Sequence, residues 1–152
     1  IDHIMALMQF EAEERKIQLE QRVPKDMPPV LGDETQISQV LVNIVVNAFH
    51  AMPRGGNCRI TAEARAEDGK RWVEIVVTDT GIGIEKEELP RLFEPFYTTK
   101  SSGTGLGLAI AYRIMQDHGG TIQVSSVPGN GTRVVMQLPV AVHQQQGLAV
   151  HS

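Results

Sequence analysis

Asp79 is the residue of this sequence best placed to bind a ligand, because it directly follows a strand-like run and opens the segment Asp79-Thr80-Gly81-Ile82-Gly83. A carboxylate at the end of a strand can accept a hydrogen bond from a ligand, and an exocyclic amine is a natural donor. Gly81 and Gly83 carry no Cβ, so the backbone can approach a flat ring closely. The segment predicts a site for an amine-bearing ring, and the alternative is a plain glycine-rich loop.

A second glycine-rich segment, Gly103-Thr104-Gly105-Leu106-Gly107, opens a predicted helix. The first N–H groups of a helix are unpaired and lie at the positive end of its dipole, which suits a phosphate. The segment follows a long loop rather than a strand, so it is not the dinucleotide-binding fingerprint, and it lacks the Gly-Lys-Ser/Thr of a Walker loop.

Two amides complete the set of candidates. Asn43 and Asn47 are four residues apart on an apolar helix, which places both on one side of it. Buried amides cost stability unless they are hydrogen-bonded, so these two either serve a site or satisfy neighbouring backbone groups. Phe93 and Phe96 lie in the loop between the two glycine-rich segments, where they can attach one end of that loop to the domain.

The elements that position these residues follow from hydrophobic periodicity and from glycine and proline breaks. Asp33 with Gln36 is a typical helix start, Asp68-Gly69 is a hairpin signal, and Gly119 is a helix stop. We expect helices over residues 1–12, 33–52 and 103–118, strands over 16–23, 59–66, 72–78, 121–126 and 132–138, and a long loop over 79–102. This order predicts an α+β fold, a two-layer α/β sandwich with helices on one face of a mixed sheet.

Composition narrows the class of protein. The 152 residues fit one domain, and 41% hydrophobic residues is ordinary for a globular chain. A formal net charge of −4 without a basic run argues against nucleic-acid binding. Cys58 stands alone, so an internal disulfide is excluded, and no apolar run is long enough to cross a bilayer. We expect a cytoplasmic, monomeric fragment of a longer protein, with no membrane contact of its own.

The order of these segments, Asn-xxx-Asn, Asp-x-Gly-x-Gly, Phe-x-x-Phe and Gly-x-Gly-x-Gly, resembles the catalytic and ATP-binding domain of sensor histidine kinases of the nitrogen-regulation type, in the GHKL ATPase superfamily. The resemblance covers about residues 16–139. It implies a Bergerat-type ATP-binding fold with an ATP lid. Residues 1–14 would be the end of a dimerisation-domain helix and its linker, 15–140 the catalytic domain and 141–152 a flexible tail.

The resemblance also implies roles for single residues. Asp79 would accept the adenine amine in a pocket shaped by Gly81 and Gly83, and Asn47 would ligate Mg²⁺. Asn43 would be catalytic together with Asn47, at the position where ATP-hydrolysing relatives carry a water-activating Glu. The remaining nucleotide-binding candidates are His50, Lys100, Gly103, Thr104, Gly105, Leu106 and Gly107. His50 either contacts phosphate or lines the rim of the pocket, and the alternative for Lys100 is simple solvation.

No histidine of this chain has the pattern of a phosphoacceptor, since His3 lacks the following acidic and proline residues. The implied reaction is therefore transfer of the ATP γ-phosphoryl to a histidine on a separate dimerisation domain of the parent protein, which would in turn serve a response regulator. The parent is either membrane-anchored or not. Two alternatives stay open: an ATP hydrolase of the topoisomerase or mismatch-repair type, and a nucleotide-gated binding module without transfer activity.

Overall fold

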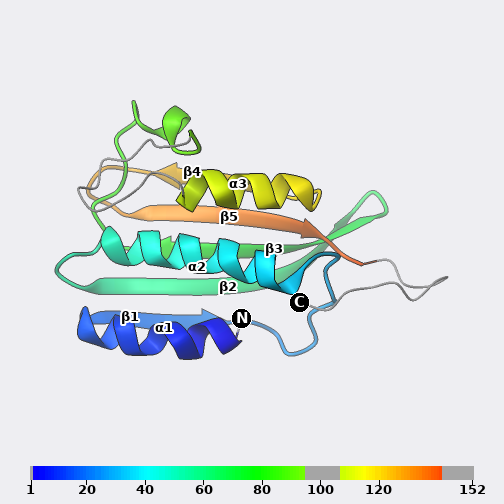
Figure 1. Ribbon diagram of the computed structural model, residues 1–152, viewed down its shortest axis with the longest axis horizontal. Coiled ribbons are helices and arrows are strands. Elements are labelled where there is room, and N and C mark those ends of the chain that lie inside the picture. Colours follow the sequence, from blue (N-terminus) through cyan, green and yellow to red (C-terminus); the bar gives the residue numbers. More distant parts are fainter. Residues whose placement is uncertain (1, 95–106, 142–152) are drawn as a thin grey trace.

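The computed structural model describes residues 2–94 and 107–141, and within them a mixed sheet is covered by helices (Figure 1). The helices are α1 (Asp2–Glu14), α2 (Glu34–His50) and α3 (Gly107–Asp117), with a short 3-10 turn at Leu89–Arg91. The strands are β1 (Ile17–Arg22), β2 (Gly56–Glu67), β3 (Lys70–Asp79), β4 (Thr121–Ser126) and β5 (Thr132–Pro139). No helix of the described residues is long and apolar enough to cross a membrane.

The five strands lie in the order β1-β2-β3-β5-β4. β1 pairs with β2 in parallel, and the other neighbours pair in antiparallel, so the sheet is mixed. All three helices lie on the same side of this sheet, as Figure 1 shows. The predicted α+β fold, a two-layer sandwich with a mixed sheet, is confirmed.

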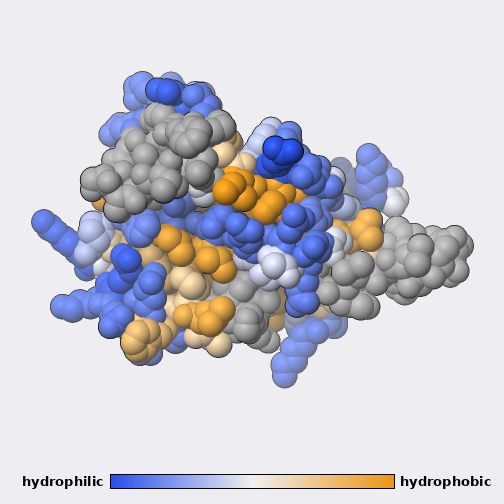
Figure 2. Space-filling model, in the orientation of Figure 1, coloured by the Kyte–Doolittle hydropathy of each residue, from blue (hydrophilic) through white to orange (hydrophobic). Residues whose placement is uncertain are grey.

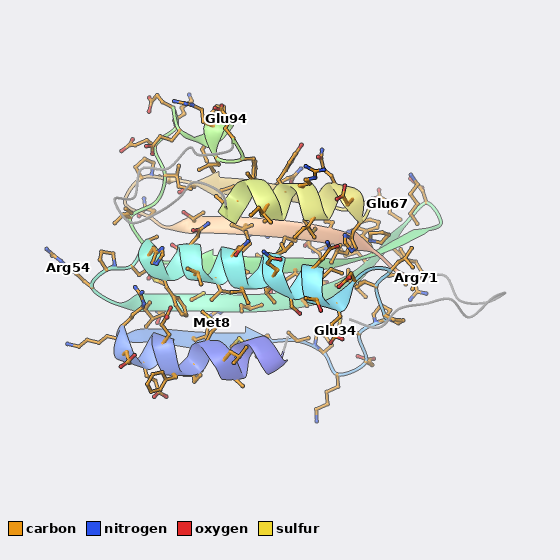
Figure 3. All side chains as sticks on the ribbon, in the orientation of Figure 1. Met8, Glu34, Arg54, Glu67, Arg71 and Glu94 are labelled. Carbon is orange, nitrogen blue, oxygen red and sulfur yellow. The ribbon has the colours of Figure 1, made fainter. Side chains whose placement is uncertain are left out.

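The core lies between the helices and the sheet. Side chains of β3 alternate, with Val73, Ile75 and Val77 buried under the helices. From α2, the most completely buried large side chain is Phe49. Figure 3 labels Met8 on α1, which is buried in the same core together with Ala12. The first helix therefore packs on this domain, and its continuation into a dimerisation domain stays a prediction.

Local signals placed the helix ends well. Asp33 caps α2, because its side chain accepts a hydrogen bond from the Gln36 N–H at 3.1 Å, as predicted. The stop at Gly119 is also confirmed, with a φ of +71°. The helix that was expected to reach residue 52 ends at His50, and the strand expected from residue 59 begins at Gly56, because pairing with β1 extends it.

His118 connects α3 to the start of α2. Its Nε2 accepts the Asp33 N–H at 3.0 Å, and its Nδ1 lies 2.8 Å from the Ile114 carbonyl oxygen. A ring nitrogen that accepts carries no proton, so Nδ1 is the protonated nitrogen and the imidazole is neutral. The bond to Asp33 makes this histidine a link between the two helices.

Figure 2 shows that the exposed apolar residues of this face are separated by polar ones. The exposed large hydrophobic side chains of the described residues include Leu7 and Phe10 on α1 and Ile110 on α3.

Candidate functional site

Asp79 is the last residue of β3, as the sequence predicted, and it lies between two other strands. Its cross-strand partners are Cys58 on β2 and Thr132 on β5. The side chain is half-buried and accepts a hydrogen bond from the Gly81 N–H at 2.8 Å. This bond fixes the orientation of the carboxylate at the start of the loop that follows β3.

Close backbone packing explains the two glycines after Asp79. Gly81 is buried against the end of α2, where an added Cβ would collide with the carbonyl oxygen of Ala51. The Ile82 N–H donates to that same oxygen at 3.0 Å. Gly83 has a φ of +77°, and a Cβ there would collide with the carbonyl of Val127. The loop therefore needs glycine to fit between α2 and the β4–β5 turn, in addition to any need to approach a ring.

The C-terminal half of α2 supplies the polar residues of this part of the molecule. Asn43 and Asn47 are half-buried, and His50 is exposed at the last position of the helix. The Asn43 side-chain nitrogen donates to the Gly107 carbonyl oxygen at 3.1 Å, so α2 is bonded to the first described residue of α3. Two of the candidate residues, Asn43 and Gly107, are therefore in contact, and their roles toward a nucleotide stay predictions.

Figure 3 helps to locate this end of the molecule. The labelled Arg54 follows α2 and Glu94 ends the first described part of the chain, and both lie toward the side on which α2 ends. The labelled Glu34, at the start of α2, lies toward the opposite end, as does the β2–β3 hairpin with Glu67. Asn47, His50 and Asp79 thus come from elements that all terminate at the same end of the sheet.

Cys58, the partner of Asp79 on β2, has a buried and neutral thiol. The side chain is fully buried, and burial together with the neighbouring Asp79 carboxylate raises the pKa of its thiol from 9.0 to about 12. The thiol is therefore neutral at any physiological pH, and the only negative charge of this cross-strand pair belongs to Asp79.

Thr80 and Ser126 are site residues that the sequence reasoning missed. The Thr80 hydroxyl oxygen accepts the Asn57 N–H at 3.0 Å and approaches the Met52 sulfur at 3.7 Å. Ser126 accepts the Ile84 N–H at 2.8 Å. Both hydroxyls bond to groups distant in the chain, so no local sequence signal could have identified them.

Part of the predicted site lies outside the described residues. This applies to Phe96 and to the phosphate-side candidates Lys100, Gly103, Thr104, Gly105 and Leu106, whose roles stay predictions. Phe93 is described, and its ring stacks on that of Tyr112 of α3, with centroids 5.0 Å apart. The predicted attachment of this loop to the domain is confirmed at Phe93.

The donor set fits a metal that is held mainly by a bound ligand. Within residues 2–94 and 107–141, no group of three or more His, Cys, Asp or Glu side chains could hold a metal ion. Mg²⁺ commonly keeps several waters and takes only one or two protein ligands besides the phosphates of a nucleotide. The half-buried amide oxygen of Asn47 is a hard oxygen ligand of the required kind.

Comparison with known proteins agrees with this geometry. Residues 32–142 match the family described as histidine kinase-, DNA gyrase B-, and HSP90-like ATPase. The sensor histidine kinase ZraS of Salmonella typhi is 41% identical over 145 residues, which cover 95% of this chain and 30% of that protein. Sporulation kinase E of Bacillus subtilis (strain 168) is 40% identical, over 92% of this chain and 19% of that protein. The chain thus spans less than a third of these curated relatives.

Solved structures resemble this fold over most of the chain. The catalytic domain of histidine kinase ThkA, in a nucleotide-free form, has a TM-score of 0.80 and 31% identity, covering 91% of this chain and 89% of that one. Full-length ShkA in complex with AMPPNP has a TM-score of 0.78 and 31% identity, covering 93% of this chain and 30% of that one.

Proposed function

Since the chain belongs to the family of histidine kinase-, DNA gyrase B- and HSP90-like ATPases, we propose that it serves as the catalytic domain of a two-component sensor histidine kinase. Membership of this family implies ATP binding. The reaction we assign is transfer of the γ-phosphoryl group from ATP to a histidine on a separate dimerisation domain of the same parent protein. The observation that carries the proposal is the convergence of Asp79, its glycine loop and the amides of α2 at one end of the sheet.

The base would be recognised by Asp79. Its carboxylate is half-buried and held by the Gly81 N–H, so it is oriented before a nucleotide arrives. A carboxylate that accepts the exocyclic amine of adenine would reject a base that presents a carbonyl there, because two acceptors would then face each other. Asp79 is therefore the residue to which we assign base specificity.

The phosphates would lie between α2 and the start of α3. Asn47 would contribute an amide oxygen to Mg²⁺, which when bound neutralises charge on the phosphates. His50 is exposed one turn further on, and in this proposal it either contacts phosphate or lines the rim of the pocket. Gly103, Thr104, Gly105, Leu106 and Lys100 belong to the same proposal as phosphate-side contacts.

Asn43 favours transfer to an external nucleophile over hydrolysis. An amide cannot take a proton from water, whereas a carboxylate at this position could act as a general base. A neutral imidazole needs no such base, because one ring nitrogen already has a free lone pair. In the transfer step, that lone pair forms the new N–P bond while the bond between the γ-phosphorus and the bridging oxygen breaks, and ADP leaves.

The partners we propose follow from the same assignment. They are the histidine-bearing dimerisation domain of the parent and a response regulator. In support, histidine kinase ThkA has been solved in complex with the response regulator protein TrrA, and that structure matches this chain with a TM-score of 0.75 and 28% identity. The proposal includes a cytoplasmic location, a monomeric isolated domain, and no contact of this domain with nucleic acid or membrane.

The test combines this chain with the dimerisation domain of its parent and ATP labelled in the γ-phosphoryl group. We expect acid-labile label on the dimerisation domain, no transfer with Asn47→Ala, and undiminished transfer with the exposed α2 control Gln39→Ala. Without the dimerisation domain we expect negligible release of phosphate. Steady ATP turnover by the chain alone, lost in Asn47→Ala, would contradict the kinase assignment and favour a hydrolase.

A further inference from the structure

The hydroxyl of Ser126 joins the end of β4, the turn before β5 and the loop over residues 81–84 that follows Asp79. Ser126 is the last residue of β4, and its oxygen accepts the Ile84 N–H at 2.8 Å. The same hydroxyl donates to the Gly131 carbonyl oxygen at 2.7 Å and lies 3.1 Å from the Thr132 hydroxyl. A serine hydroxyl offers one donor and two acceptor positions, so these three bonds use its full capacity.

The bonds made by Ser126 determine where the β4–β5 turn meets the loop. Gly131, whose carbonyl accepts from Ser126, packs so tightly on β3 that a Cβ there would collide with the carbonyl of Asp79. On the other side of the turn, the Gly129 N–H donates to the Ile82 carbonyl at 2.7 Å. The turn thus contacts both the backbone of Asp79 and the loop that follows it.

We propose that Ser126 is a positioning residue for base recognition: its hydroxyl holds the loop over residues 81–84 and the turn over residues 127–131 in the register that directs the Asp79 carboxylate at the base. This inference rests on the proposed function, because it assumes that Asp79 binds adenine. In this proposal Ser126 acts through Asp79 and does not contact the nucleotide itself.

Removal of this hydroxyl would affect specificity more than folding. The bonds of Ser126 lie at the edge of the sheet and involve no side chain of the core. Without them, the Ile84 N–H and the Gly131 carbonyl would lose their shared partner, and the loop would sample positions in which the carboxylate no longer meets the amine. Contacts with the phosphates, which we assign to α2 and the start of α3, would persist.

The experiment measures the affinities of the 152-residue chain for ATP and for inosine triphosphate, which carries a carbonyl in place of the amine. The unsubstituted chain should prefer ATP. In Ser126→Ala the ratio of the two affinities should fall by roughly fivefold, the equivalent of about one hydrogen bond, mainly through weaker ATP binding. The matched control is Ser125→Ala, whose side chain is exposed on the neighbouring position of β4, and it should keep the ratio.

A variant that merely loosened the domain would lower both affinities by the same factor. Thermal unfolding verifies that each variant is folded, and Ser126→Cys, which keeps the shape and weakens the hydrogen bonds, provides a second measurement. An unchanged ratio in either folded variant would overturn the role of Ser126. Equal affinity of the unsubstituted chain for the two nucleotides would instead overturn the assignment of the base to Asp79, on which this inference depends.

Discussion

The side-chain nitrogen of Asn43 donates a hydrogen bond to the carbonyl oxygen of Gly107, which joins the middle of α2 to the first residue of α3. The two residues are 64 positions apart in the sequence, yet they share the part of the molecule that we assign to the phosphates. The amide therefore combines a structural bond with a position at the proposed site.

Replacement of Asn43 by alanine should lower the free energy of unfolding by about 1 kcal/mol, because a half-buried bond to a carbonyl is lost. Asn43→Asp should cost at least as much, since two acceptors would then face each other. Urea denaturation measures both, with Gln39→Ala as the control on the exposed face of the helix. A midpoint for both Asn43 variants equal to that of the control would show that this bond does not stabilise the domain.

Asp79→Ala should weaken ATP binding by about tenfold or more, since loss of one partner of a buried hydrogen bond costs about 1–3 kcal/mol. Asp117→Ala removes the same charge from an exposed position at the end of α3 and should leave the affinity unchanged. Titration calorimetry measures the ATP affinity of both variants. An affinity unaltered in Asp79→Ala would remove the basis for placing adenine here.

The geometry of His118 predicts a neutral ring protonated on Nδ1, which nitrogen-15 NMR of the imidazole can identify directly. His118→Ala should reduce the free energy of unfolding by about 0.5–1.5 kcal/mol, because the exposed Asp33 N–H exchanges its protein acceptor for water. The adjacent Asp117→Ala is the control. A ring protonated only on Nε2 would be incompatible with this arrangement.

Cys58 should react very slowly with thiol reagents in the folded protein. With a pKa raised from 9.0 to about 12, its thiolate fraction at pH 8 is roughly a thousandfold below that of an ordinary cysteine, and the side chain is also fully buried. Because the unfolded thiol ionises first, the domain should lose stability as pH rises from about 9 toward 12, with no contribution from this group below pH 9. Rapid labelling at pH 8 without denaturant would contradict the burial.

Local chemistry explains which parts of the fold could be predicted. The cap at Asp33, the Asp68-Gly69 hairpin and the stop at Gly119 each depend on a few adjacent residues, and all three were predicted correctly. The start of β2 at Gly56 was missed, because it depends on pairing with β1, and that pairing has no local signal.

In the candidate site, too, features that depend on adjacent residues were predicted, and features that depend on distant contacts were not. Asp79 could be placed at the end of its strand from the alternation of residues before it, and this was confirmed. Gly81 and Gly83 were expected for their access to a ring, whereas their tight packing against Ala51 and Val127 emerged only from the folded chain. Ser126 and Thr80 were not singled out, because a hydroxyl next to a turn is common and its partners lie in other segments.

The pairing of β3 with β5 has a consequence for how such domains diversify. The segment over residues 80–106 connects the end of β3 to the start of α3, and of its described residues Phe93 is the hydrophobic one that packs against the core. The entropy of closing a loop grows only with the logarithm of its length, so doubling this connection would cost about 0.6 kcal/mol. Insertions and deletions in this segment should therefore change the free energy of unfolding only slightly, so its length can vary in evolution while the sheet and its helices stay the same.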